Sequence, residues 1–202
     1  MASGGLLEST EHVTKQHLLE VGKNLLLQGG YNDLGLQGLL ARAGVPKGSF
    51  YYHFRNKEDF GLQAIDFYMA EVHRGLDECL EDPSRSPLER VRRFFETSRD
   101  KYRLEGNLGC LLGGLGQELS GTSEAFRRKV EWCFSMIADR LAACLERARQ
   151  EGELPRDSDP RDLANVLLNC WEGAALRCRL LRDTTPLDRM LDFYFSTLRV
   201  AT

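Results

Sequence analysis

The sequence has no long hydrophobic run, and this absence narrows its class. No apolar stretch approaches the roughly 18 residues of a membrane-spanning helix, so an integral membrane protein is excluded. The N-terminal segment has no basic region and is unlike a secretory signal. Hydrophobic residues make up 42% and charged residues 28% of the 202 residues, as in soluble globular proteins. We therefore expect a cytoplasmic protein with a buried core.

The chain also lacks the motifs of metal and phosphate chemistry. Its six cysteines form no CxxC pair, and no histidine stands near them at ligand spacing. There is no glycine-rich phosphate loop. We expect no metal site and no cofactor, and cysteines that are mostly free thiols packed in the core.

Excess positive charge is absent from the chain as a whole. Lys and Arg number 27 against 30 Asp and Glu, a formal net charge of −3. Bulk charge therefore does not indicate a nucleic-acid partner, and DNA binding would require a local basic patch. Residues 42–57 provide one, since they contain four basic residues and no acidic residue. The basic residues are Arg42, Lys47, Arg55 and Lys57.

Helical periodicity runs through nearly the whole chain, without strand-like alternation or an internal repeat. Proline, aspartate and serine at 82–87 mark the best break. We predict an all-α fold of about nine helices. The segments that periodicity and turn residues delimit are approximately 11–28, 36–43, 46–52, 56–80, 88–102, 126–145, 159–181 and 186–200.

The helices predicted at 36–43 and 46–52 meet at Gly44, an arrangement typical of a helix-turn-helix motif. Gly44 allows a tight turn, and Pro46 suits the first turn of the second helix. Val45 and Phe50 are expected to point inward and leave the polar and aromatic side chains outside. The alternative is a solvated face of an ordinary helical turn. The glycine turn, the proline and the aromatic cluster together favour DNA binding.

The segment from Gly44 to Glu58 resembles the signature of TetR-type transcriptional repressors. The resemblance is strong over about residues 11–68, although Gly35 replaces the usual Ser or Thr cap and Leu40 the usual Ala. It implies a repressor, not an enzyme, that binds a palindromic double-stranded DNA operator as a homodimer. The implied domains are a DNA-binding domain at 9–69 and an effector-binding and dimerisation domain at 70–202. The implied DNA-contacting positions are Gln37, Lys47, Gly48, Ser49, Tyr51, Tyr52, His53 and Lys57.

Segments 109–113, 115–118 and 171–177 resemble, more weakly, the acrylate-responsive and electrophile-sensing repressors of this type. In the electrophile sensors, a cysteine at the position of Cys110 responds to reactive compounds. The lysine that partners it is matched here by Arg179. The resemblance implies a small-molecule effector, either an unsaturated carboxylate or an electrophile.

The residues themselves leave the role of Cys110 open. Burial among small and apolar residues would raise the pKa of its thiol, whereas a helix N-terminus after Gly109 would lower it. Glu172 with its neighbouring arginines is either a solvated set or the polar end of an effector pocket. The candidate effector-binding residues are Cys110, Trp171, Glu172, Arg177 and Arg179.

In the family, the last two long helices of each subunit form a four-helix dimer interface. We expect the same here from the helices at about 159–181 and 186–200. Large apolar stripes on these helices would otherwise be exposed. The residues expected in those stripes are Leu167, Leu187, Leu191 and Leu198.

Two other function classes compete with the repressor hypothesis. A thiol-based enzyme at Cys110 would need a nearby base, but all four histidines lie in the N-terminal part of the chain and none is near it in sequence. A structural helical adaptor would leave the basic segment 42–57 unexplained. The sequence therefore favours a regulator with no catalytic residues.

Overall fold

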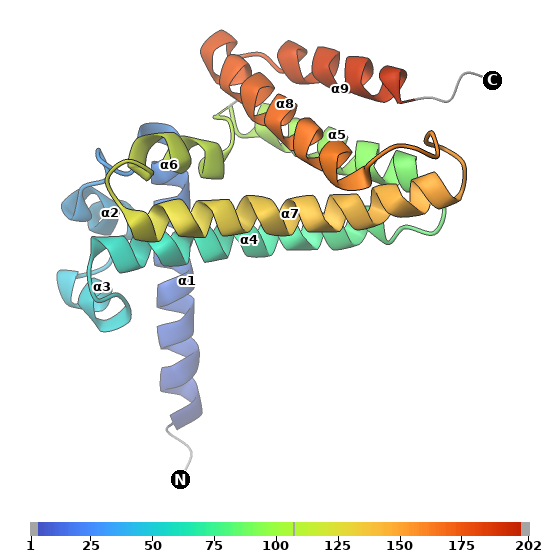
Figure 1. Cartoon of the computed structure of the whole chain (residues 1–202). Coiled ribbons are helices and arrows are strands. Elements are labelled where there is room, and N and C mark those ends of the chain that lie inside the picture. The colour runs from blue at the N-terminus through green and yellow to red at the C-terminus, as the bar shows by residue number, and fades with distance from the viewer. Residues whose placement is uncertain (1–3, 107, 199–202) are drawn as a thin grey trace.

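The computed structural model describes residues 4–106 and 108–198, with side chains from residue 14 onward. These residues form nine α-helices and no strand, which confirms the predicted all-α fold (Figure 1). The helices are α1 (Gly4–Gly29), α2 (Leu36–Ala43), α3 (Lys47–His53), α4 (Lys57–Leu80), α5 (Pro87–Leu104), α6 (Leu111–Leu119), α7 (Glu124–Gln150), α8 (Pro160–Leu181) and α9 (Thr185–Thr197). No helix in the described part of the chain is long and apolar enough to cross a membrane.

Side-chain caps fix several of the helix starts that the sequence indicates. The Asn56 side chain accepts a hydrogen bond of 2.8 Å from the Asp59 backbone N–H at the start of α4. Ser86 opens α5 with a complete capping box to Glu89. Each cap pairs a backbone N–H that the first helical turn leaves without a partner.

Helix α6 is the element that sequence periodicity did not delimit. Three of its nine residues are glycine, which lowers the intrinsic preference of the segment for helix. Tertiary packing compensates, because four leucines of α6 are buried in the core. Two bounds also differ from the prediction: α1 begins at Gly4 rather than near residue 11, and Pro46 caps α3 from outside rather than opening its first turn.

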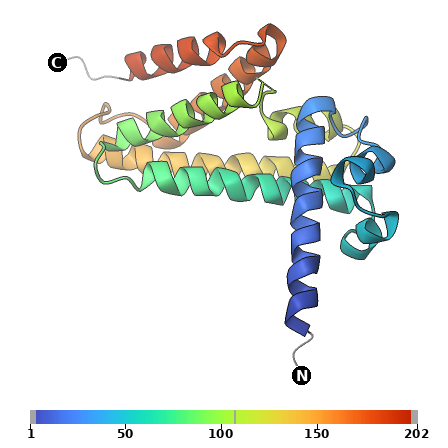
Figure 2. The same ribbon diagram turned by 180° about the vertical axis from the view of Figure 1, so that it is seen from behind.

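Helices α2 and α3 pack beside α1 at one end of the molecule, and α4 leads from them into the rest of the chain (Figures 1 and 2). α4 and α7 run side by side. α9 lies above α5 and α7 in Figure 1, and α8 packs against both α7 and α9. A cluster of Phe50, Phe54 and Phe60 joins α3 to α4, with ring centroids 5.0–5.6 Å apart. The two short helices are therefore fixed to the start of α4 by an aromatic core.

The four leucines expected at the dimer interface are instead buried inside the subunit. Leu167 and Leu187 are 0% exposed, Leu191 1% and Leu198 8%, so the expectation that they form exposed stripes is wrong. Leu167 lies on the inner face of α8, and the other three lie on α9 or directly after it, on the side that packs into the subunit core. The large hydrophobic side chains of α8 and α9 that remain exposed are Val166, Leu176, Leu180, Leu181 and Phe193.

Candidate DNA-binding surface and effector cavity

The turn between α2 and α3 has the geometry that the helix-turn-helix prediction requires. Gly44 ends α2 in the left-handed region, with φ of 65°, and its N–H bonds to the Leu40 carbonyl. Only glycine adopts this backbone conformation without steric cost. Phe50 is 2% exposed, and Val45 packs partly buried against the same core, so both point inward as predicted.

Most of the predicted DNA-contacting residues lie on the outer face of α2 and α3. Gln37, Lys47 and Gly48 are exposed, and Tyr51 and Tyr52 are 55% and 66% exposed. The set therefore forms one polar and aromatic surface, which we call the recognition face.

The other three predicted contact residues, Ser49, His53 and Lys57, are partly buried. The Lys57 ammonium lies 4.4 Å from the centre of the Tyr31 ring, and its burial lowers the pKa of Lys57. Tyr31 belongs to the turn after α1. Lys57 thus ties the start of α4 to the end of α1, at the edge of the recognition face.

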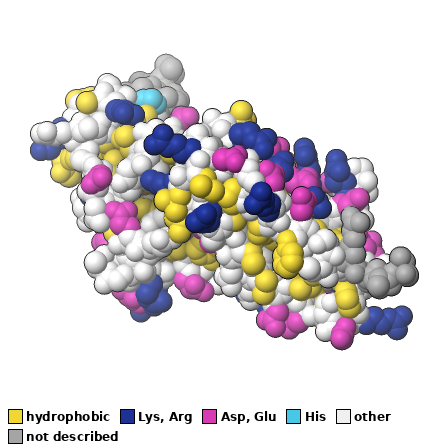
Figure 3. Space-filling view, turned by 90° about the horizontal axis from the view of Figure 1, so that it is seen from above, with side chains coloured by type: hydrophobic (Ala, Val, Ile, Leu, Met, Phe, Trp, Pro, Cys, Tyr) yellow, Lys and Arg dark blue, Asp and Glu magenta, His cyan; other side chains and the backbone are white. Residues whose placement is uncertain are grey.

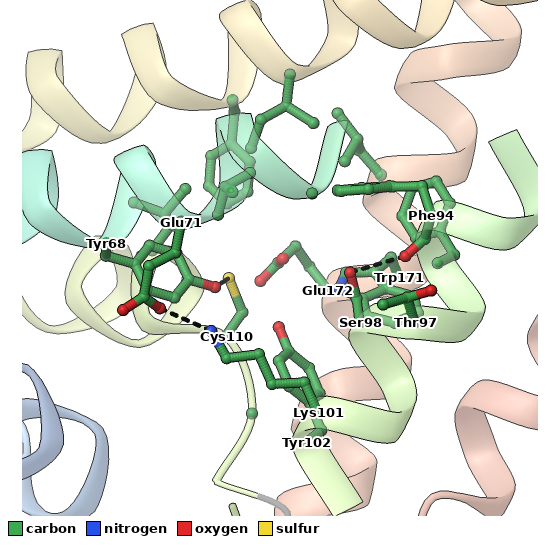
Figure 4. Close-up of a pocket in the computed structure, with 18 of the residues that line it drawn as sticks. Tyr68, Glu71, Phe94, Thr97, Ser98, Lys101, Tyr102, Cys110, Trp171 and Glu172 are labelled. Atoms are coloured by element: carbon green, nitrogen blue, oxygen red, sulfur yellow. Dashed lines mark hydrogen bonds and ion pairs between the residues drawn. The ribbon is translucent and has the colours of Figure 1, made fainter. Parts of the chain in front are cut away.

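A cavity of about 140 Å³ lies away from this surface, between α4, α5, α7, α8 and the start of α6 (Figure 4). Its wall is mostly apolar, with aromatic rings from Phe94, Phe95 and Phe134. A small number of polar groups gather at one end of it. These are Tyr68, Lys101, Tyr102, Cys110 and Glu172 (Figure 4). An apolar cavity with a few convergent polar groups is the usual form of a small-molecule site.

Cys110 and Glu172 face one another across the polar end of the cavity. Cys110 is the residue just before α6, and the Glu172 carboxylate on α8 points toward its sulfur (Figure 4). Burial and the negative charge of Glu172 raise the pKa of the Cys110 thiol, and burial raises the pKa of Glu172 to about 7. The start of α6 does not lower the thiol pKa enough to offset burial. Of the two effects that the sequence left open, burial prevails, so we expect a protonated thiol near neutral pH.

Two buried tyrosines complete the polar end. The Tyr68 hydroxyl lies 4.0 Å from the Cys110 sulfur, and Tyr102 interacts with both Tyr68 and Trp171. Burial raises the pKa of both tyrosines well above its ordinary value, so their hydroxyls stay protonated and can donate hydrogen bonds.

A second charged group closes the side of the cavity near α1. Glu71 accepts hydrogen bonds of 2.6 Å from Lys23 and 2.7 Å from Lys101, and Glu105 lies 3.8 Å from Lys101. Although burial acts to raise it, these lysines hold the pKa of Glu71 below its ordinary value. Lys23 belongs to α1, so the cavity wall is joined by charge to the helix that carries the DNA-binding end.

The two arginines predicted for the effector site do not line this cavity. The Arg179 guanidinium donates to the carbonyls of Leu27, Gln28 and Leu108, at 3.1, 3.0 and 3.2 Å. It therefore caps the C-terminal end of α1 rather than facing the cavity. Arg177 is exposed on α8 and does not line the cavity. Of the five predicted residues, Cys110, Trp171 and Glu172 line this cavity, and Arg179 lines a hollow beside it that Cys110 and Glu172 share.

Glu118 on α6 is a second link to α1 that sequence reasoning missed. Its carboxylate accepts the backbone N–H groups of Tyr31 at 2.7 Å and Asn32 at 2.6 Å. Sequence reasoning also missed Tyr68 and Lys101 in the cavity. Tyr102 carried a signal, since it follows the apolar period of the helix predicted at 88–102. Among the described residues, no cluster of His, Cys, Asp and Glu could hold a metal ion.

Fold and surface together define a helix-turn-helix DNA-binding regulator. The family described as bacterial regulatory proteins of the tetR family matches residues 18–63, and the tetracyclin repressor-like C-terminal domain matches residues 87–194. The chain belongs to the TetR family of transcriptional repressors. It is a DNA-binding regulator and not an enzyme, and membership implies a dimer that binds an operator and an effector.

Characterised relatives match the chain along most of its length. It is 35% identical to the transcriptional repressor DhaR of Mycobacterium sp. strain GP1, covering 93% of each chain. It is 39% identical to the transcriptional regulator AcuR of Cereibacter sphaeroides, covering 85% of this chain and 79% of AcuR. It is 34% identical to the transcriptional repressor NemR of Escherichia coli K12, covering 90% and 92%.

Solved structures agree with the sequence comparison. The regulatory protein TetR from Rhodobacter sphaeroides superimposes with a TM-score of 0.87 at 36% identity, over 91% of this chain and 97% of that one. The reduced form of E. coli NemR gives 0.85 at 32% identity, over 95% and 99%. The predicted resemblance to this subgroup of regulators is therefore confirmed, because these relatives match nearly the whole chain.

Proposed function

We propose that this cytoplasmic protein represses transcription from a palindromic operator and is released when a small unsaturated carbonyl compound enters the cavity. The observation that supports this most directly is the position of Cys110. It lines the cavity and also immediately precedes α6, the helix whose Glu118 binds the backbone after α1. A ligand that moves the start of α6 would therefore disturb the end of α1.

We assign operator binding to residues 9–69. The α3 face, with Lys47, Tyr51 and Tyr52, would enter the major groove, while Lys57 at the edge would bind phosphate. Gln37, Gly48, Ser49 and His53 complete the proposed contacts. Gly48 has open space where a side chain would stand, so the DNA backbone can approach it closely.

The dimer half of the proposal assigns residues 70–202 to effector binding and subunit association. Val166, Cys170, Gly173 and Leu180 are exposed and spaced four, three and seven residues apart, which places them on one face of α8. Phe193 on α9 is 72% exposed. Hydrophobic side chains are visible among the charges on the side of the molecule where α8 and α9 lie (Figure 3). We assign the two-fold interface to this outer face rather than to the buried leucines.

Release requires that the ligand favour a conformation that does not fit the operator. Two contacts support a path from the cavity to the DNA-binding end. Arg179 holds the last carbonyls of α1, and Glu118 holds the N–H groups that follow α1. Arg179 is on α8, which also carries Glu172. Glu118 is on α6, which begins directly after Cys110.

Footprinting of the protein on DNA beside its own gene tests this proposal. We expect one protected palindrome, and protection that weakens steeply as salt rises, because the contacts displace counterions from phosphates. Millimolar acrylate or a maleimide added to the complex should remove the footprint. A protein that protects no site, or protection that both compounds leave intact, would contradict the proposal.

A further inference from the structure

We propose that Glu172 is the base that activates Cys110 for addition to an uncharged α,β-unsaturated carbonyl compound, and that Gly113 makes room for it. This inference rests on the proposed function only for its consequence, release from DNA. The chemistry itself requires no operator. It identifies the effector class as neutral enones, enals, esters or amides rather than carboxylates.

The position of Glu172 depends on a glycine in α6. A Cβ atom built on Gly113 would lie 2.1 Å from the Glu172 Oε2 atom and 3.8 Å from the Cys110 Cβ atom. No side chain other than hydrogen leaves the carboxylate room to approach the thiol from α8. The next residue, Gly114, has open space at the same point. A side chain at Gly113 would therefore collide with the Glu172 carboxylate, whereas one at Gly114 would not, and this difference can be tested.

The charges around the cavity disfavour an anionic ligand. Three carboxylates line it, from Glu71, Glu105 and Glu172, against one lysine, Lys101. Lys101 already contacts both Glu71 and Glu105, and Lys23 pairs with Glu71 as well. Within the described residues no ion pair reaches Glu172. Inside this cavity, a ligand carboxylate would meet the Glu172 carboxylate and no unpaired cation. Arg179 lies outside it, in the adjoining hollow that Cys110 and Glu172 also line, where it donates to three backbone carbonyls.

The reaction can be written with every proton accounted for. The Glu172 carboxylate takes the thiol proton as the sulfur attacks the β-carbon, so an S–C bond forms while the C=C π bond breaks. The electron pair of the π bond moves onto the carbonyl oxygen, where the Tyr68 hydroxyl, near the sulfur, can donate a hydrogen bond. Glu172 then returns its proton to the α-carbon. The product is a thioether on Cys110, with no oxidant or further reactant needed.

This arrangement also explains why a thiol with a raised pKa can still react. The free thiolate is disfavoured by burial and by Glu172, so the group resists reagents that require a preformed anion. Glu172 takes the thiol proton while the S–C bond forms, so no free thiolate is needed beforehand. Glu172, whose pKa is raised to about 7, is partly ionised near neutral pH and can both take and return a proton.

The test follows modification of Cys110 by intact-mass and peptide mass spectrometry in the full-length protein. Acrylamide and sodium acrylate are the probes, since they are nearly equal in size and differ in charge. Glutathione in the same solution corrects for intrinsic reactivity. The variants are Glu172→Gln and Gly113→Ala, with Gly114→Ala as the matched control and circular dichroism to verify folding.

We expect acrylamide to modify Cys110 at least about tenfold more slowly in Glu172→Gln than in wild type, since a lost base typically costs that or more. Gly113→Ala should also be slowed, and Gly114→Ala should match wild type. Relative to glutathione, Cys110 should favour acrylamide over acrylate. Unchanged rates in folded Glu172→Gln, or an equal relative rate with acrylate, would overturn the inference.

The same samples separate this inference from the proposed function. If Glu172→Gln leaves the Cys110 rate unchanged while acrylamide still releases wild-type protein from its operator, the inference fails and the proposed function stands. If Cys110 reacts through Glu172 but the modified protein stays on DNA, the proposed function fails and the inference stands.

Discussion

Cys110 and Glu172 are separated by 62 positions in the sequence, and the start of α6 and the middle of α8 bring them to the same cavity. Sequence reasoning could identify both as candidates, because each is a polar group within an apolar stretch. It could not identify Tyr68 or Lys101, which come from α4 and α5 and carry no local pattern. It could not predict the partners of Arg179 either, because the end of α1 offers carbonyls to its guanidinium, and only the fold shows that they lie within reach.

Glu172 should make the stability of the protein depend on pH. Its pKa is raised from 4.5 to about 7 in the folded state, so folding favours the protonated acid. The contribution of Glu172 to the stability of the folded state is complete below pH 4.5 and is lost as pH rises through about 7. The free energy of unfolding of the wild-type protein should therefore fall by about 2 kcal/mol as pH rises over this range, and Glu172→Gln should abolish this fall. Chemical denaturation at pH 5 and pH 8 measures it.

Cys110, Tyr68 and Tyr102 face Glu172 from the start of α6, from α4 and from α5. They stay protonated across the same range because burial raises the pKa of each. They therefore contribute no competing titration between pH 5 and pH 8. A variant with the same decline as wild type would show that another group is responsible.

Lys47 tests the recognition face. Lys47→Ala should lower operator affinity about five- to tenfold and reduce the slope of log affinity against log salt by about one, because one phosphate contact is lost. The free energy of unfolding should change by less than about 0.5 kcal/mol, since the side chain is exposed. Fluorescence anisotropy across a salt series measures affinity and slope. Arg156→Ala, an exposed cation in the loop before α8, is the matched control and should leave both unchanged.

The helix boundaries show which local signals are sufficient on their own. The helix starts near residues 56, 88 and 159 could be predicted because caps and prolines act within a few residues. Helix α6 was not delimited because its glycines weaken local preference and its stability comes from leucines buried against other helices. The interface residues of α8 and α9 were predicted wrongly for another reason. Both helices carry buried and exposed hydrophobic side chains, and periodicity alone does not show which of them meet the core.

Helix α6 should act as the connection between cavity and DNA-binding end. In Glu118→Ala, the Tyr31 and Asn32 N–H groups lose their acceptor, which should lower the free energy of unfolding by about 1 to 2 kcal/mol. Cys110 should still be modified by acrylamide at the wild-type rate, while the modified protein is released from DNA less completely. Gln117→Ala, an exposed neighbour on the same helix, provides the control. Full release from modified Glu118→Ala would remove α6 from the proposed path.

At the scale of the whole molecule, one subunit carries both the recognition face and the cavity. α4 begins beside the recognition face and passes along the cavity, so no flexible linker separates the two regions. The domain division at residues 69 and 70 falls inside this continuous helix and stays a prediction. The sequence predicted the class of fold and the DNA-binding motif well, because the motif is local. It could not predict the cavity wall, which is assembled from helices far apart in the chain.

The dimer interface gives a paired prediction. Leu180→Glu should produce folded monomers, because Leu180 is 67% exposed and a charge there costs nothing until a partner helix covers it. Leu191→Arg should unfold the subunit instead, since Leu191 is 1% exposed in its core. Analytical ultracentrifugation and circular dichroism distinguish these outcomes. A folded dimer in Leu180→Glu would place the interface on another surface.

The most direct measurement follows a fluorescently labelled operator duplex by anisotropy while acrylamide is added to the bound protein. Mass spectrometry of the same samples reports the fraction of Cys110 modified. We predict that wild-type protein leaves the operator in proportion to that fraction, and that Cys110→Ser binds the operator but is not released. Wild-type protein that stays bound with Cys110 fully modified, or Cys110→Ser released at the same acrylamide concentration, would contradict a repressor controlled through this cavity.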